Sequence, residues 1–315
     1  CRAGGTGSTL FGKQFRTVTA GKGCMEAYET FPGIEVSFNV FLASEVKFRH
    51  DASDSVLEIY YCRSGRVGWN MQGGTAVYLG AGDVTAHSMA CCANSAMMFP
   101  LGYSEGISIS VDLKQLSSIC PEVLKNAGVE VDQLRDRFCS GKPSAIPSCS
   151  DLEHIFAPLF SAPVSVRISL LKLKVLEILI YLSNMKLEHK ELTQYFSQQT
   201  ELIKEIHQQL TEHLDQRFTI AELSKQYLIN TSTLKEIFKA VYGQPIATYM
   251  KEFRVRQAMK LLRETNATIA DIASQVGYQT QGKFSSAFQS IVKMSPREYR
   301  KIQGIAPSDS FSKTL

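Results

Sequence analysis

The feature that most constrains this chain is a pattern of thirty-odd residues that occurs twice between residues 219 and 300. The first copy opens with Thr219–Leu223 (TIAEL) and the second with Thr268–Ile272 (TIADI), at an offset of 49 residues. Further on, Phe238 is matched by Phe288 at an offset of 50, so the second copy carries one extra residue at its turn. A repeat that keeps its apolar positions predicts one small helical unit built twice.

Each copy has the pattern of a short helix, a tight turn and a second helix. Thr219 followed by Glu222 is the pattern of a capping box, in which the two residues satisfy each other's backbone N–H groups at a helix start. Thr268 and Asp271 occupy the same places in the second copy. Because Asp is shorter than Glu, we expect the second box to close less well.

The second helix of each copy is predicted over residues 231–241 and 280–291. Apolar side chains recur at i, i+3, i+4 and i+7 and should face inward. These are Leu234, Ile237, Phe238 and Val241, and then Phe284, Ala287, Phe288 and Ile291. The outward side chains are Ser232, Thr233, Lys235, Glu236 and Lys239, and then Gln281, Lys283, Ser285, Ser286 and Gln289. Such side chains suit the DNA major groove, where Gln pairs with adenine, Lys with guanine and Ser with either.

A long helix is predicted between the two units, from Pro245 to Glu264. At about 1.5 Å per residue it would span on the order of 25–30 Å, close to the ~34 Å of one DNA turn. Two helix-turn-helix units at this spacing would read two successive major grooves on one face of a duplex.

The net positive charge of the chain lies in the region that contains the repeat. Residues 199–303 hold 15 Lys and Arg against 10 Asp and Glu, whereas residues 1–198 hold 18 against 19. The positive excess therefore lies on the part that is expected to meet phosphates.

The first 163 residues are expected to form a cupin-like antiparallel β-barrel or jelly roll. Short alternating segments separated by Gly-bearing turns run from Ile34 to Val111, and Tyr78–Val84 resembles the strand-turn signature of cupin-like barrels. The histidine motif of enzymatic cupins is missing, since His50 and His87 stand alone. The fold class is thus α+β, and we expect no cofactor, no metal and no enzymatic activity.

A broadly apolar helix is predicted over residues 164–185 and should bury two faces, one against the barrel and one against a partner subunit. The dimerisation residues would be Leu171, Val175, Ile178, Leu179 and Leu182. Residues 186–199 would form a linker, residues 200–303 the DNA-binding domain and residues 304–315 a tail. The alternative is an entirely intramolecular core helix.

No stretch reaches the roughly 18 apolar residues needed to cross a membrane, and the start of the chain lacks a secretory pattern. A cytoplasmic protein is expected, with its eight cysteines reduced. Among them Cys62, Cys91 and Cys92 leave open a thiol- or metal-responsive sensor, with buried inert cysteine as the alternative.

The C-terminal hundred residues resemble the DNA-binding domain of the AraC/XylS transcription regulators. The resemblance rests on six segments: Ile220–Leu223, Phe238–Gly243, Arg254–Leu262, Ile269–Tyr278, Phe284–Phe288 and Ser295–Arg300. It implies a homodimeric, ligand-controlled activator that works with RNA polymerase at promoter half-sites. It also assigns base readout to Ser232, Lys235 and Glu236 in the first unit, and to Gln281, Gly282, Ser285 and Ser286 in the second.

Three positions depart from the family pattern. Lys293 stands where the family has Gly after the second recognition helix, so it would have to adopt a left-handed conformation at a cost of about 1 kcal/mol. Gln289 replaces a basic residue, and Glu236 replaces Arg. Together they predict a weaker grip on phosphates and different reading chemistry in the two units.

An effector pocket in the barrel is expected from aromatic and basic side chains. The candidates are Phe38, Tyr60, Arg66, Trp69, Tyr78 and His87, with an ordinary aromatic core as the alternative. The stretch from Leu171 to Leu179 is similar to the PchR-like branch that responds to iron-siderophore complexes. That similarity implies a siderophore or another acidic or aromatic metabolite as effector. A barrel enzyme fused to a DNA-binding module is the remaining alternative.

Overall fold

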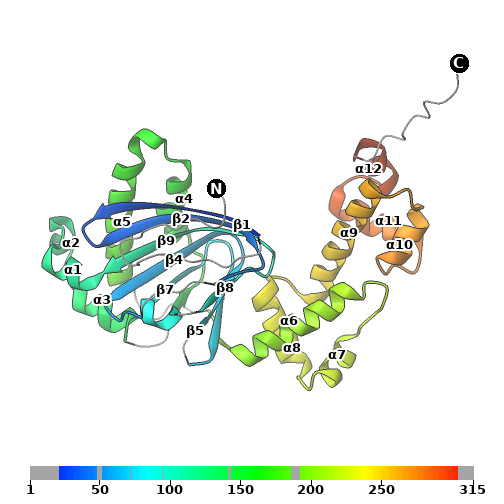
Figure 1. The fold of residues 1–315 in the computed structure, drawn as a ribbon, viewed down its shortest axis with the longest axis horizontal. Coiled ribbons are helices and arrows are strands. Elements are labelled where there is room, and N and C mark those ends of the chain that lie inside the picture. The colour runs from blue at the N-terminus through cyan, green and yellow to red at the C-terminus, as the bar shows by residue number, and fades with distance from the viewer. Residues whose placement is uncertain are drawn as a thin grey trace, which may run out of the picture. The chain divides into compact units, whose positions relative to one another are not determined.

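The structure is a computed structural model, and it describes residues 21–47, 52–71, 73–93, 95–140, 143–185 and 192–303. The chain divides into two compact units at Gln198 and Gln199, one rich in strands and one entirely helical (Figure 1). Of the residues considered in the sequence, His50, one of the eight cysteines (Cys1), part of the expected linker and the tail lie outside the described ranges.

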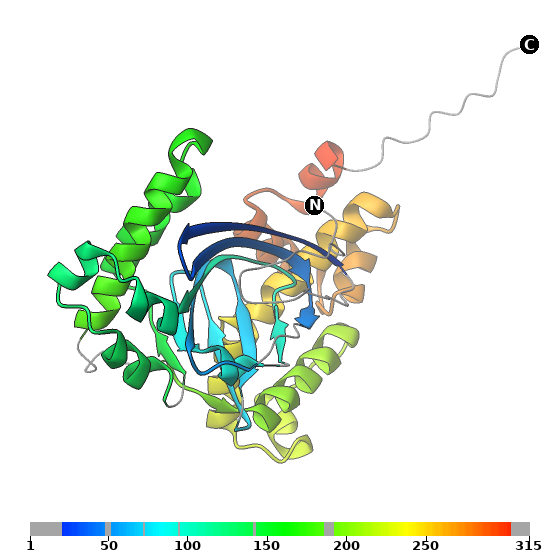
Figure 2. The same ribbon diagram turned by 60° about the vertical axis from the view of Figure 1, so that its left-hand side comes forward.

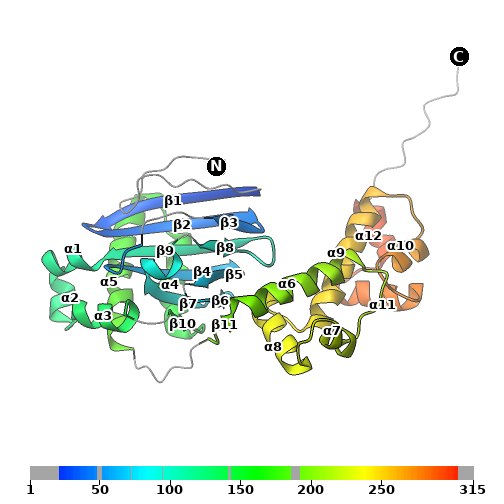
Figure 3. The same ribbon diagram turned by 60° about the horizontal axis from the view of Figure 1, so that its bottom comes forward.

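The N-terminal unit contains two antiparallel sheets. The six-stranded sheet has the order β1-β2-β9-β4-β7-β10, and the five-stranded sheet has the order β11-β6-β5-β8-β3 (Figure 3). The strands are β1 (Gly21–Phe31), β2 (Ile34–Ala43), β3 (Glu45–Lys47), β4 (Val56–Gly65), β5 (Val67–Met71), β6 (Thr75–Leu79), β7 (Val84–Ser88), β8 (Ala96–Met98), β9 (Ser104–Asp112), β10 (Ser144–Ile146) and β11 (Tyr195–Phe196). An N-terminal half made of antiparallel strands confirms the expected fold class.

Alternation along the strands divides the side chains of the six-stranded sheet between two cores. Leu57, Ile59 and Tyr61 of β4 pack toward the helices, whereas Tyr60 and Cys62 pack toward the five-stranded sheet. Successive side chains of a strand point to opposite faces, so one strand serves both layers.

Helices cover the outer face of the six-stranded sheet (Figure 2). They are α1 (Leu113–Ser118), α2 (Glu122–Asn126), α3 (Val131–Phe138), α4 (Ser150–Ser161) and α5 (Arg167–Asn184), with the short 3-10 helix η2 (Val164–Val166) before α5. The longest of these, α5, packs on α4 and β1. A second 3-10 helix, η1 (Met89–Cys92), packs with the core between the two sheets. Within the described residues, no helix is long and apolar enough to span a membrane.

The C-terminal unit is built around one long helix, α9. Its helices are α6 (Ser197–Glu212), α7 (Ile220–Gln226), α8 (Thr231–Tyr242), α9 (Ile246–Glu264), α10 (Ile269–Gln275), α11 (Gln281–Val292) and α12 (Pro296–Gln303). The first half of α9 buries Ile246, Tyr249 and Met250, whereas Val255, Ala258 and Leu262 form a core with α10, α11 and α12. The two helical units therefore share α9 as a common axis.

Candidate nucleic-acid interface

The first helix-turn-helix unit consists of α7 and α8. Its capping box is confirmed, because the Thr219 backbone N–H donates to Glu222 Oε2 at 2.7 Å and the Glu222 N–H donates to Thr219 Oγ1 at 3.2 Å. These hydrogen bonds hold the pKa of Glu222 below its usual range. Asn230, which the sequence analysis did not single out, caps α8 by accepting from the Thr233 N–H. Its place directly before the helix was the available signal.

The second unit repeats this arrangement with α10 and α11. Thr268 and Asp271 also close a capping box, but the Thr268 N–H reaches Asp271 Oδ2 at 3.2 Å rather than 2.7 Å in the first unit. The Thr268 hydroxyl, however, donates to Asp271 Oδ2 at 2.6 Å, against 2.9 Å in the first unit, so the expectation that the second box closes less well was wrong. Thr280 caps α11 by accepting from the Lys283 N–H.

The inward face of α8 is confirmed, whereas that of α11 is confirmed only in part, because Ala287 is half-buried and Ile291 is exposed. Leu234, Ile237, Phe238 and Val241 are buried on α8, and Phe284 and Phe288 are buried on α11. Ile291, predicted to face inward, is 37% exposed. It lies in the last turn of α11, where the neighbouring Val292 packs against the core formed with α9 instead, so the prediction for Ile291 was wrong.

The predicted reading side chains all lie on the outer faces of α8 and α11. Nine of these eleven are exposed, and Thr233 and Ser285 are half-buried. Lys235, Lys239 and Lys283 have no ion-pair partner among the residues that the structure describes. The charged groups of the first unit and the amide and hydroxyl groups of the second are thus presented on helices of the same length, 12 residues each. The assignment of these side chains to DNA remains a prediction.

The departure at Lys293 is confirmed in its geometry. Lys293 caps the C-terminus of α11 in the left-handed conformation, with φ of 65°, and Gly243 does the same for α8 with φ of 82°. The Lys293 N–H donates to the Gln289 carbonyl at 3.0 Å, so the cap closes despite the side chain.

Helix α6 joins this unit through an aromatic cluster around His207. The imidazole stacks on Tyr242 at 4.3 Å between ring centroids, and its Nε2 lies 2.8 Å from the Tyr249 hydroxyl. Burial lowers the pKa of His207 from 6.5 to about 4, so the ring is neutral at pH 7. It therefore acts as a packed aromatic hydrogen-bonding residue that holds α6 against α8 and α9.

The effector candidates do not come together in one place. Tyr60 and Trp69 meet edge to face between the two sheets, with ring centroids 5.1 Å apart. Phe38 lies on the opposite face of its sheet, against Tyr28 and Phe160. A single pocket cannot be lined by all of them, because they lie on opposite faces of the sheet. The sequence alone does not give the strand register, and therefore does not show which side chains share a face.

Two further candidates lie away from Tyr60 and Trp69. Tyr78 pairs with Gly68 in the sheet, and its hydroxyl donates to Met98 Sδ at 3.9 Å, on the face opposite Trp69. Arg66 lies against Gly80 at a turn, and burial lowers its pKa while nearby Asp83 opposes that shift.

His87 belongs instead to a polar row that the sequence analysis missed. Glu35, Ser110, Glu58 and His87 are consecutive cross-strand partners on the face that carries Tyr60. The Ser110 hydroxyl donates to Glu58 Oε1 at 2.6 Å. Burial raises the pKa of Glu58 to about 8, against the opposing effect of that hydrogen bond. A charged residue inside the alternating segment 57–61 was the available signal.

The predicted dimerisation residues are buried within the chain's own core. Leu171, Val175, Ile178, Leu179 and Leu182 all pack with the sheet and helices of the N-terminal unit. This corrects the predicted face of α5, because side chains without exposed surface cannot contact a partner subunit. The exposed side of the same helix carries Leu173, which is 65% exposed.

The cysteines show little of the chemistry of a sensor. The seven described cysteines form no disulfide, and Cys62, Cys92 and Cys139 are buried. Burial raises the pKa of the Cys62 thiol to about 12 and also raises that of Cys92, which disfavours the reactive thiolate. Among the described residues, no group of His, Cys, Asp and Glu could hold a metal ion.

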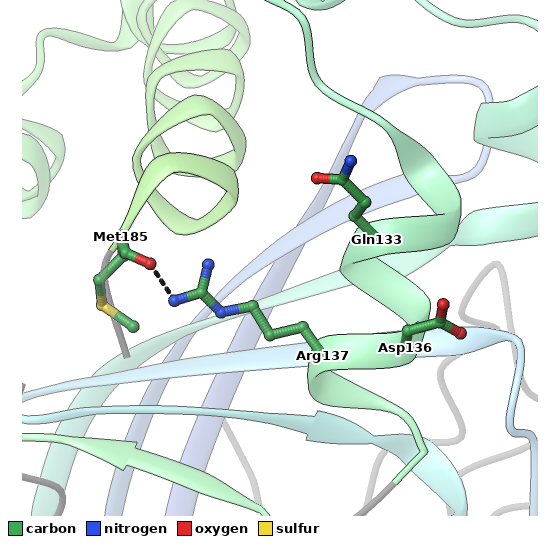
Figure 4. A pocket seen from close by; sticks show the side chains of 4 residues that line it. All are labelled: Gln133, Asp136, Arg137 and Met185. Atoms are coloured by element: carbon green, nitrogen blue, oxygen red, sulfur yellow. Dashed lines mark hydrogen bonds between the residues drawn. The ribbon is translucent and has the colours of Figure 1, made fainter. Parts of the chain in front are cut away.

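A surface pocket of about 400 Å³ lies between α3 and the C-terminal end of α5 (Figure 4). Gln133, Asp136, Arg137 and Met185 line it. Its cation is already engaged, because the Arg137 guanidinium donates to the carbonyls of Leu182, Ser183 and Met185. None of the six effector candidates lines this pocket, and Arg137 serves as a cap for α5.

Known proteins match the C-terminal unit. A family model described as a helix-turn-helix domain matches residues 223–302. A Streptomyces lividans protein described as an AraC-like transcription regulator is 40% identical over 84 residues, 27% of this chain and 28% of that protein. The transcriptional activator RhaR of Mannheimia succiniciproducens is 34% identical over 91 residues, 29% of this chain and 33% of that protein.

Among solved structures, the C-terminal domain of the response regulator AraT from Geobacillus stearothermophilus is similar. It is 26% identical, with 35% of this chain and 93% of that chain covered and a TM-score of 0.33. The chain spans only 28% of the Streptomyces lividans protein and 33% of RhaR, about a third of each regulator's length.

Proposed function

We propose that the chain is a DNA-binding transcription regulator, because its C-terminal unit matches a helix-turn-helix family model and is similar to AraC-like regulators. The observation that carries the proposal is the doubled unit. Two capped helices of equal length, α8 and α11, each expose a polar face while their apolar faces pack around α9. This is the arrangement that readout of two adjacent major grooves requires.

The two units read DNA by different chemistry. On α8, Lys235 and Lys239 suit guanine and phosphate, and Glu236 accepts from cytosine. On α11, Gln281 suits adenine, and the hydroxyl groups of Ser285 and Ser286 can donate hydrogen bonds to base edges or accept hydrogen bonds from them. Each subunit therefore recognises an asymmetric half-site, with more salt-dependent binding at the segment under α8 because its contacts carry charge.

The N-terminal unit is the regulatory part in this proposal. A small-molecule effector binds between the two sheets near Tyr60, Trp69 and His87 and changes how the DNA-binding units are presented. The row that contains Glu35 and Glu58 suits a ligand with hydrogen-bond donors and an aromatic surface better than the acidic ligand expected from the sequence. The apolar residues of α5 that are similar to siderophore-responsive regulators lie in the core of the N-terminal unit, so this likeness does not support a siderophore as the effector.

The remaining partners follow from the same family. The protein acts as a cytoplasmic homodimer at promoter half-sites and activates transcription with RNA polymerase. The subunit contact uses the exposed side of α5 with Leu173, in place of the buried side. No observation favours the thiol- or metal-responsive alternative, since Cys62 and Cys92 are buried with raised pKa values.

The proposal is tested by selecting duplexes from a random pool with the full-length protein and then measuring affinity by gel shift. Lys235→Ala and Gln281→Ala should each weaken binding to the selected duplex by about tenfold or more, since a good base contact contributes roughly 1–3 kcal/mol. Lys125→Ala, which removes one exposed charge from α2, is the matched control and should bind like the parent. If all three variants bind the selected duplex with the parent's affinity, α8 and α11 are not the reading helices.

A further inference from the structure

The turns of the two helix-turn-helix units have the same backbone but different surroundings. Leu228 in the first turn has φ of 52°, and Gly277, 49 residues later, has φ of 80°. Leu228 is 94% exposed, so this left-handed turn tolerates a side chain where space is open. The backbone conformation alone does not demand glycine at 277.

What demands glycine at 277 is a contact with the first half of the domain. A Cβ on Gly277 would lie 1.9 Å from the carbonyl oxygen of Leu214 and 3.1 Å from Arg254 Cζ. Leu214 belongs to the loop between α6 and α7, far from 277 in sequence. The second turn is therefore packed directly against the backbone of the first unit's loop.

The same carbonyl is held by the connecting helix. Arg254 of α9 donates its guanidinium to the Leu214 carbonyl at 3.2 Å and to the Gln216 carbonyl at 3.1 Å. Desolvation lowers the pKa of Arg254, in keeping with its half-buried position. Three segments thus meet at one oxygen atom: the loop before α7, the axis α9 and the turn before α11.

We propose that Gly277, Arg254 and the Leu214 carbonyl form an inter-unit lock that sets the distance and rotation between the two reading helices. The inference rests on the proposed DNA-binding function and names the residues that position it. Helix α9 alone joins the units along one axis, and a single helix can bend and twist. The lock adds a second, direct contact across the units, so α8 and α11 meet DNA at one fixed spacing.

The test measures tolerance to spacing. The parent protein selects its duplex, and one or two base pairs are then inserted between the two contacted segments. Each inserted pair moves the second segment by about 3.4 Å and rotates it, so the parent should lose at least about tenfold in affinity. The Cβ of the Gly277→Ala variant forces the Leu214 carbonyl away, so the two units are no longer held at one spacing. The affinity of this variant should therefore change by less than about threefold when the same base pairs are inserted.

Two further variants make the result specific. Leu228→Ala changes the corresponding turn position in open surroundings and should keep the parent's dependence on spacing. Arg254→Met removes the donors without adding an atom near Gly277 and should flatten that dependence as Gly277→Ala does. Far-UV circular dichroism of every variant identifies any that do not fold; if Gly277→Ala does not, Arg254→Met decides the question.

The outcomes separate the lock from the proposed function. Folded Gly277→Ala and Arg254→Met proteins that keep the parent's sensitivity to insertion overturn the lock and leave DNA binding intact. A parent protein that enriches no duplex overturns the proposed function, and the lock with it.

Discussion

Leu228 and Lys293 are the two described residues other than glycine with a left-handed backbone. Each occupies a place that glycine fills in the other copy, at Gly277 and Gly243. The conformation of Lys293 could be predicted from the repeat, because Gly243 marks the helix end. The left-handed conformation of Leu228 could also be predicted from Gly277, but only once the two copies are aligned. A leucine in a turn does not by itself indicate a left-handed backbone.

Glycine at either position should stabilise the C-terminal unit. A side chain in the left-handed region costs about 1–2 kcal/mol, part of which is offset by the extra freedom of glycine in the unfolded chain. Leu228→Gly and Lys293→Gly should therefore each raise the free energy of unfolding by about 1 kcal/mol, measured by urea denaturation with far-UV circular dichroism. Gly243→Ala should lower it, and a stabilising Gly243→Ala would contradict the strain argument.

His207 makes the stability of the C-terminal unit depend on pH. Its pKa is lowered by burial from 6.5 to about 4, so between these values the unfolded chain binds a proton that the folded chain does not. Stability is fully present above pH 6.5 and is lost as pH falls toward 4, by on the order of 2–3 kcal/mol. His207→Phe keeps an aromatic ring in the stack and should flatten this slope. A variant with the parent's slope would show that other groups cause it.

At the scale of elements, α5 shows what periodicity can and cannot predict. The apolar pattern over 164–185 correctly indicated a helix, which runs over Arg167–Asn184 and buries one broad face against the sheet and other helices of its own unit. It could not say that the five residues assigned to a partner belong to the core. Helical spacing fixes which residues share a face but not what covers that face.

A matched pair of leucines on α5 tests this assignment. Leu179→Ala should lower the free energy of unfolding of the N-terminal unit by about 2–4 kcal/mol, because it leaves a cavity in a packed core. Leu173→Ala should change it by less than about 0.5 kcal/mol. Trp69, the single tryptophan, lies in this unit and reports its unfolding by fluorescence. Equal losses for the two variants would contradict the described faces of α5.

The polar row of the six-stranded sheet has its own pH signature. Burial raises the pKa of Glu58 from 4.5 to about 8, so the folded chain holds this proton longer than the unfolded chain. Stability is fully present below pH 4.5 and is lost as pH rises through about 8. Glu58→Gln keeps an acceptor for Ser110 and should make the N-terminal unit more stable than the parent at pH 8. A Glu58→Gln protein less stable than the parent there would show that Glu58 is ionised and paired in the fold.

At the scale of the whole molecule, the C-terminal unit was predictable, whereas the grouping of the effector candidates in the N-terminal unit was not. Two copies of one pattern predict helix caps, turns and buried faces well, because a residue in one copy can be compared with its match in the other copy. The N-terminal strands have no second copy, and alternation alone leaves the register open. Phe38 and Tyr78 were therefore grouped with Tyr60, although they lie on other faces.

The central claim is that one fold, used twice, reads two DNA segments by different chemistry. Its most direct test is the affinity of the parent and of Gln281→Ala for every single-base-pair substitution of the selected duplex. The claim predicts that Gln281→Ala loses discrimination, by about 1–3 kcal/mol per pair, only within the segment under α11, while preferences under α8 stay unchanged. A variant whose preferences are unchanged everywhere, or weakened equally in both segments, would contradict it.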